Sequence, residues 1–122
     1  MSTRNFFQSV THALHGIGYV FRHEQNFRIQ VVISIVVFVF SWLFPLTGSE
    51  RIAMVLLIVF VLVLELVNSA IEKFTDIVKP RLHEQVGIVK DIMAGTVLIS
   101  SLGAIIWGLV IFLPYIIELF VL

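Results

Sequence analysis

The chain has 122 residues, 59% of them hydrophobic and 13% charged, with a mean hydropathy of +1.05. A soluble domain has roughly 45–50% apolar residues, so this composition predicts an integral membrane protein, with residues 1–122 forming one domain. Eight Lys and Arg balance eight Asp and Glu, which gives no support for a nucleic-acid partner. The absence of Cys excludes disulfides, thiolate catalysis and Cys-based zinc sites.

The N-terminal segment predicts a helix that lies on the membrane surface. Its apolar residues fall on one face of a helix over 5–27, namely Phe6, Val10, Ala13, Leu14, Ile17 and Phe21. Charged residues and His interrupt the segment, so it lacks the apolar core and cleavage site of a secretory signal, and we expect it to remain in the mature chain. An amphipathic helix of this kind is typical of the membrane interface, and a solvated helix against a partner is the alternative.

Three apolar stretches are long enough to cross a bilayer, at approximately 29–49, 52–72 and 92–117. Pro45, Thr47 and Gly48 predict a short reversal between the first two. Lys79 to Lys90 is polar and contains a proline, which predicts a loop before the third span. The expected fold is therefore an all-α integral membrane protein with three transmembrane helices and an N-terminal amphipathic surface helix.

Basic residues are distributed unequally about these spans. Only Arg51 falls on one side of the membrane, and the other seven fall on the opposite side: Arg4, Arg22, Arg28, Lys73, Lys79, Arg81 and Lys90. Cytoplasmic loops carry the excess of Lys and Arg. The distribution predicts a multi-pass protein with a cytoplasmic N-terminus, so that the surface helix and the 79–90 loop face the compartment that contains ATP.

Glu65 is the most informative residue because it interrupts the second apolar stretch. It lies thirteen residues after Ile52, which is about 20 Å along a helix. A charged residue at the centre of a span costs roughly 2.5–3.5 kcal/mol even on lenient scales, so it usually has a task; a protonated Glu that joins helices is the alternative. Asn68, Glu72 and Asp76 continue its helical stripe. Such groups can bind a divalent cation and position a hydroxyl nucleophile, although Glu72 and Asp76 taken singly fit ordinary solvation.

Three further charged residues are candidates near the same membrane face. Glu24 precedes the first span and could add an acidic ligand, or form a surface pair with Arg28. Lys90 and Asp91 precede the third span, where a helix N-terminus favours phosphate, and ordinary interfacial anchoring is the alternative. The His residues lack the spacing of a zinc site, and no P-loop sequence is present, so any use of ATP follows another architecture.

The segment Glu65-Leu-Val-Asn-Ser-Ala-Ile-Glu72, followed by Asp76 and by Lys90-Asp91, resembles the signature of the prokaryotic diacylglycerol kinase and undecaprenol kinase family. The resemblance extends from the Phe6-Phe7 region to the third span. It implies a homotrimer in the bacterial cytoplasmic (inner) membrane, with active sites shared between neighbouring subunits. It also implies that the protein phosphorylates a membrane lipid alcohol from ATP with Mg²⁺.

The resemblance also implies residue roles. Glu65 is similar to the general base on the lipid hydroxyl, and we expect it to contact the lipid together with Ser69. Glu24 and Glu72 are similar to magnesium ligands that bridge to ATP. The residues expected to contact ATP are Glu24, Glu72, Asn68, Lys90, Asp91 and, as weaker candidates, His12, Arg81 and His83.

Departures from the diacylglycerol kinase pattern bear on the substrate. His12 replaces a tyrosine, and Met93-Ala-Gly-Thr96 replaces Gly-Ser-Ala-Ala. The Lys90-Asp-x-x-Ala-Gly95 form and the Ile111-Phe-Leu-Pro114 ending are more similar to undecaprenol kinases, which favours undecaprenol as the substrate and undecaprenyl phosphate as the product. Diacylglycerol, giving phosphatidic acid, is the alternative. A non-catalytic assembly or proton-conducting membrane protein is a second alternative, for which Glu65 alone would suffice.

Overall fold

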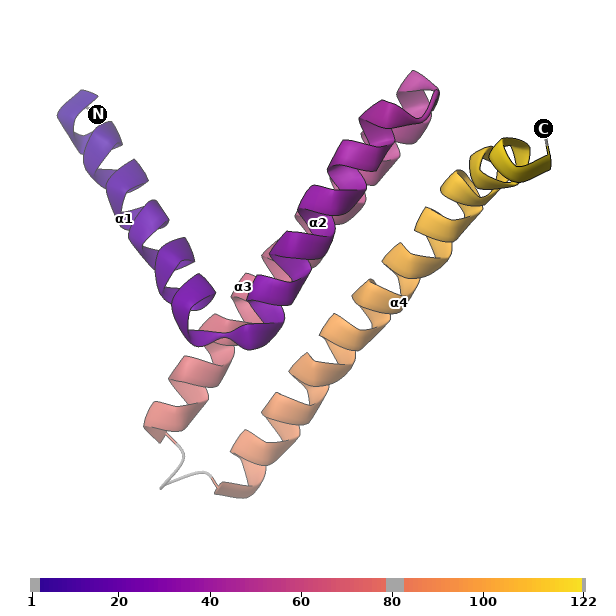
Figure 1. Cartoon of the computed structure of the whole chain (residues 1–122). Helices are drawn as coiled ribbons and strands as arrows, with labels where there is room; N and C mark the ends of the chain where they lie inside the picture. Colours follow the sequence, from indigo (N-terminus) through magenta and orange to yellow (C-terminus); the bar gives the residue numbers. More distant parts are fainter. Residues whose placement is uncertain (1–2, 79–82, 122) are drawn as a thin grey trace.

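The computed structural model describes residues 3–78 and 83–121. Four helices follow one another along the chain: α1 (Thr3–His23), α2 (Gln25–Leu43), α3 (Gly48–Val78) and α4 (His83–Val121) (Figure 1). The last three contain windows apolar and long enough to cross a bilayer. The all-α membrane fold with three candidate spans and an N-terminal helix, predicted from the sequence, is confirmed.

The three long helices lie side by side, and α1 diverges from them (Figure 1). α3 packs against both α2 and α4, whereas α1 contacts only the nearby parts of α2 and α3. The chain bends at Glu24, whose backbone is extended (φ −116°, ψ 109°). No residue of α1 is buried, so its apolar face is not covered by the rest of the chain. That exposed face agrees with the expectation of an interfacial helix.

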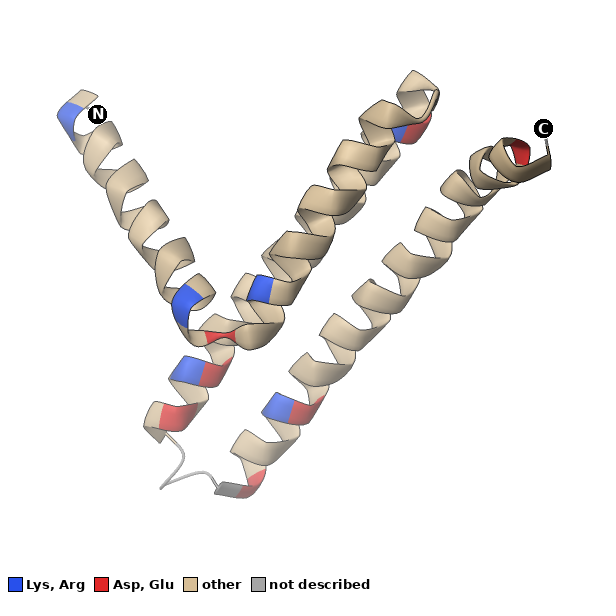
Figure 2. Ribbon diagram, in the orientation of Figure 1, with Lys and Arg blue, Asp and Glu red and all other residues tan. Residues whose placement is uncertain are grey.

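Charged residues occur mainly near the ends of the long helices (Figure 2). The end that contains the turn between α2 and α3 is called the hairpin end below. The opposite end, where α1 meets α2, is called the junction end. Long stretches of α2 and α4 between the two ends carry no charge (Figure 2), as a hydrocarbon environment requires.

The hairpin end is closed by a capping box and a small apolar core. The Thr47 hydroxyl accepts a bond from the Glu50 amide (3.2 Å), and the Glu50 carboxylate accepts one from the Thr47 amide (2.9 Å). These reciprocal bonds satisfy amides at the start of α3. Glu50 also accepts a bond from the Tyr115 hydroxyl (2.5 Å), which attaches α4 to the hairpin. Leu46, Met54 and Ile111 form the buried core beside these bonds.

Arg51 completes the hairpin by capping the preceding helix. Its guanidinium donates to the carbonyl oxygens of Ser41 (3.0 Å) and Phe44 (3.2 Å), at the end of α2. It also lies over the Trp42 ring, 4.9 Å from the centroid. Carbonyls at a helix C-terminus have no partner within the helix, so Arg51 satisfies groups that hydrocarbon could not.

Arg28 caps the preceding helix, α1, at the junction end. Its guanidinium donates to the carbonyl oxygens of Phe21 (2.9 Å) and Arg22 (2.8 Å), at the end of α1. The ion pair between Arg28 and Glu24, considered above as an alternative role for Glu24, does not occur in the described part of the chain. The Glu24 carboxylate is therefore not committed to Arg28.

The start of α4 differs from the expected loop. Residues 79–82 lie outside the described residues, but 83–90 are helical, so the expectation of a loop as far as Lys90 was wrong for this part. Their polar composition suggested a loop, yet only Pro80 in this region is a strong helix breaker. Val86, which is 4% exposed, anchors this first part of α4. Tertiary packing thus extends the helix about two turns beyond the apolar span.

We predict that Arg51→Met lowers the free energy of unfolding by about 1–3 kcal/mol, because two carbonyls near the end of α2 lose a charged donor. Unfolding by SDS in mixed micelles, followed by circular dichroism, measures the change. Ile52→Met is the matched control, because Ile52 is exposed and neighbours Arg51. Equal stability of Arg51→Met and the control would contradict the capping role.

Candidate functional site

The half of α3 nearest the junction end buries polar residues. Glu65 is 2% exposed, and Ser69 and Thr75 are also buried. In the other half of α3, the buried residue is the apolar Met54. Spacings of three, four and seven residues place Asn68, Ser69 and Glu72 on the Glu65 side of the helix. Successive turns in this half of α3 therefore direct polar side chains toward the interior of the chain.

Two further acidic residues lie within electrostatic range of Glu65. Glu24, at the bend between α1 and α2, and Glu72, two turns along α3, both lie close enough for their charges to act on the Glu65 carboxyl. Within the described ranges, one chain contains no group of three or more His, Cys, Asp or Glu arranged to hold a metal ion. That Glu24, Glu65 and Glu72 share a site therefore stays a prediction.

Three buried polar atoms near Glu65 have no hydrogen-bond partner within residues 3–78 and 83–121: Gln30 Oε1, Asn68 Oδ1 and Ser69 Oγ. Buried polar groups in proteins are nearly always paired, so each such atom calls for an explanation. Two of the three belong to residues that the sequence nominated for ATP or lipid contact. A polar ligand at this position would supply the missing partners.

Gln30 is the site residue that the sequence analysis missed. Its Nε2 donates to Glu65 Oε2 across 3.4 Å, joining α2 to α3. A search for charged residues within the apolar spans does not find Gln30, because its amide carries no charge. The sequence did offer one indication of a role for Gln30, namely that it is a polar residue near the start of the first apolar span, on α2.

Lys90 and Asp91 are placed differently from the expectation. They lie inside α4, which begins at His83, so the expectation of a helix N-terminus with free amides at this point was wrong. Lys90 instead forms an ion pair with Asp76 of α3 (2.6 Å), and the charge of Glu72 also acts on it. Asp91 is exposed. Lys90 therefore adds a positive charge near the acidic residues Asp76 and Glu72.

The weaker candidates are scattered or not described. His12 is exposed on α1. Within the described part of the chain it forms no hydrogen bond with Glu65, Asn68, Ser69 or Glu72. Arg81 and the side chain of His83 lie outside the described residues. The α1 helix is instead held to α3 by Tyr19, whose hydroxyl accepts a bond from Lys73 (2.8 Å).

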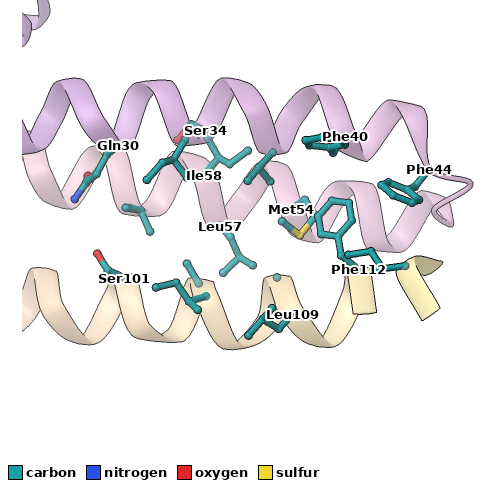
Figure 3. A pocket seen from close by; sticks show the side chains of 17 residues that line it. Gln30, Ser34, Phe40, Phe44, Met54, Leu57, Ile58, Ser101, Leu109 and Phe112 are labelled. Atoms are coloured by element: carbon teal, nitrogen blue, oxygen red, sulfur yellow. The ribbon is translucent and has the colours of Figure 1, made fainter. Parts of the chain in front are cut away.

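An apolar cavity of about 490 Å³ lies between α2, α3 and α4. Figure 3 shows Gln30 and Ser101 near one end of it and Phe44 and Phe112 near the other. Its lining is otherwise almost wholly apolar. Because Gln30 also donates to Glu65, one polar side chain connects the lining of the cavity with the buried carboxyl. A molecule with an apolar chain and a polar end fits this arrangement.

Comparisons with known proteins agree with this geometry. Residues 11–112 match the family described as prokaryotic diacylglycerol kinase. The chain is 36% identical over 109 residues to an undecaprenol kinase of Bacillus subtilis, covering 89% of each chain. It is 33% identical to a diacylglycerol kinase of Synechocystis, covering 96% of this chain and 67% of the relative.

A diacylglycerol kinase of Haemophilus influenzae is 30% identical over 85% of this chain and 89% of its own. Both the family match and these identities extend over most of the chain. The family match over residues 11–112 includes Glu65, Asn68 and Glu72, all of α2 and α3, and most of α4. The chain belongs to the prokaryotic diacylglycerol kinase family, a family of membrane lipid kinases.

Proposed function

We propose that this protein transfers the terminal phosphoryl group of ATP to the hydroxyl of undecaprenol, with Mg²⁺, at the cytoplasmic face of a bacterial inner membrane. The observation that carries the proposal is the buried Glu65 carboxyl, 2% exposed, which lies within electrostatic range of Glu24 and Glu72. Its setting beside an apolar cavity suits a lipid alcohol, whose chain and hydroxyl need different surroundings.

Glu65 acts as the general base in this proposal. It accepts the proton of the lipid hydroxyl as the hydroxyl oxygen forms a bond to the γ-phosphorus, and the bond from phosphorus to the leaving oxygen of ADP breaks. Its burial keeps bulk water away from the acceptor position, which disfavours hydrolysis of ATP. Ser69, one turn further along α3, would contact the lipid head.

Glu24 and Glu72 would hold the metal. Magnesium in kinases is commonly bound by one or two carboxylates together with phosphate oxygens and water, and these two residues supply that number of carboxylates. The bound ion would neutralise charge on the phosphates. Asn68 Oδ1, buried without a partner, and Lys90, beside Glu72, would contact the nucleotide, as would Asp91, His12, Arg81 and His83 by family likeness.

We also propose that the active protein is a homotrimer with a cytoplasmic N-terminus. The family resemblance supplies the trimer. The described residues of one chain contain no three-residue metal-binding group, which favours a site completed by a neighbouring subunit. Seven of the eight Lys and Arg lie on the proposed cytoplasmic side.

The preference for undecaprenol rests on two segments of sequence. Lys90-Asp-x-x-Ala-Gly95 and Ile111-Phe-Leu-Pro114 are more similar to undecaprenol kinases. Identities of 36%, 33% and 30% to relatives of both names are too close to separate the substrates by themselves. Diacylglycerol remains the competing substrate.

Glu65→Gln is expected to lower phosphoryl transfer at least about a hundredfold, because an amide cannot accept the hydroxyl proton. Turnover is measured with MgATP and lipid in mixed micelles, and oligomer size by gel filtration. Glu118→Gln, an exposed change near the far end of α4, is the control. Full activity of Glu65→Gln would exclude its role as base.

Glu72→Gln is expected to raise the magnesium concentration for half-maximal activity by about tenfold or more, because the metal loses a carboxylate ligand. The measurement is a magnesium titration at fixed ATP. Glu84→Gln makes the same change of charge at an exposed position of α4 and should leave the midpoint unchanged. An unaltered titration for Glu72→Gln would remove this residue from the metal site.

Purified protein with MgATP should phosphorylate undecaprenol in preference to diacylglycerol when both are offered separately in the same micelles. Glycerol serves as a water-soluble alcohol that has no chain for the apolar cavity and should not react. A preference for diacylglycerol would reverse the substrate assignment and keep the lipid kinase. Activity on neither lipid would contradict the proposed function itself.

A further inference from the structure

Gln30 stands at the meeting point of the buried carboxyl and the apolar cavity. It lies on α2, whereas Glu65 lies on α3, thirty-five residues further along the chain. Its side chain lines one end of the cavity (Figure 3), and its Nε2 points to Glu65 Oε2 at 3.4 Å. It is therefore the residue through which α2 can influence the direction of the carboxyl.

The contact to Glu65 is the only side-chain hydrogen bond that the described part of the chain gives to this carboxyl. Glu24 and Glu72 act on it by charge, and both are acidic like Glu65. A neutral N–H donor is the group that can hold one carboxylate oxygen in place and leave the other free to accept a proton. At 3.4 Å, near the long limit for an N–H···O contact, the amide reaches the carboxyl without fixing it rigidly.

The other end of the Gln30 amide argues against a purely structural role. An amide that serves to join helices gains most when both its N–H groups and its oxygen are paired. Here Oε1 is buried and has no hydrogen-bond partner among the described residues, so within that part of the chain the amide is oriented by its hydrogen bond to Glu65. Neighbouring Ser34 lines the same cavity one turn along α2 and makes no such contact with Glu65 in the described structure.

We propose that Gln30 is a positioning residue, which acts through Glu65 by turning its carboxyl toward the polar end of the cavity, where the lipid hydroxyl would lie. This inference rests on the proposed role of Glu65. It assigns to the first membrane helix a part in the reaction that is separate from metal or nucleotide binding.

The test is a double-mutant cycle measured on the full-length protein in mixed micelles with MgATP and undecaprenol. Gln30→Met keeps the length of the side chain and removes the donor, so kcat should fall about tenfold, while KM for MgATP and the SDS unfolding midpoint stay unchanged. Gln30→His, which retains an N–H donor, should recover most of the lost turnover. Gln8→Met, the same change at an exposed position of α1 that does not line the cavity, is the matched control and should behave as the wild type.

The cycle with Glu65→Gln distinguishes action through Glu65 from an independent effect. If Gln30 acts through the carboxyl, Gln30→Met should cost little further activity in the Glu65→Gln background. An additive loss, or wild-type kcat for Gln30→Met, would overturn the inference. If Gln30→Met disturbs folding, Gln30→Asn keeps an amide that is one methylene too short, and wild-type kcat for this variant would overturn the inference equally.

Failure of the inference remains separate from failure of the proposed function. Loss of activity in Glu65→Gln with full activity in Gln30→Met would refute the role of Gln30 and leave Glu65 as base. Full activity in Glu65→Gln would refute the proposed base and the inference together.

Discussion

The burial of one carboxyl in an apolar helix is the constraint on which the rest of this structure depends. Glu65 is 2% exposed, and a carboxylate removed from water is stable only among groups that can interact with it. Polar residues on the same side of α3 and Gln30 of α2 provide such groups. It also brings Glu24 and Glu72 near, which adds like charge and raises the cost of the arrangement unless a cation joins it. A site that concentrates negative charge in this way is suited to magnesium and phosphate.

The ends of the helices are organised to support that site. Arg28 and Arg51 each follow the end of a helix and donate to its final carbonyls. At the hairpin end, Glu50 closes the capping box and accepts a bond from Tyr115 of α4. These bonds fix how α2, α3 and α4 run beside one another. The register they set brings Gln30 level with Glu65, fourteen residues along the chain from Phe44 and from Arg51, respectively.

The apolar cavity between the three long helices has the character that a hydrocarbon chain requires. The three long helices leave a space of about 490 Å³, and its polar end, at Gln30 and Ser101 (Figure 3), approaches the carboxyl. Lipid alcohols carry their reactive group at one end of a long hydrocarbon chain. A single chain therefore holds an apolar space and a buried carboxyl that are connected by the side chain of Gln30.

The sequence by itself determined the membrane location and the number of spans and singled out Glu65 as a candidate, because apolar length and the cost of an intramembrane charge are local properties of the chain. Its motif spacing also indicated the family, through Glu65, Asn68 and Glu72. Local pattern was a poor guide at residues 83–90, where polar composition suggested a loop and packing of Val86 accompanies a helix. Only the tertiary structure placed Gln30 beside Glu65 and paired Lys90 with Asp76. These contacts join different helices, and their partners depend on how the helices pack, which the period of hydrophobicity within each helix does not specify.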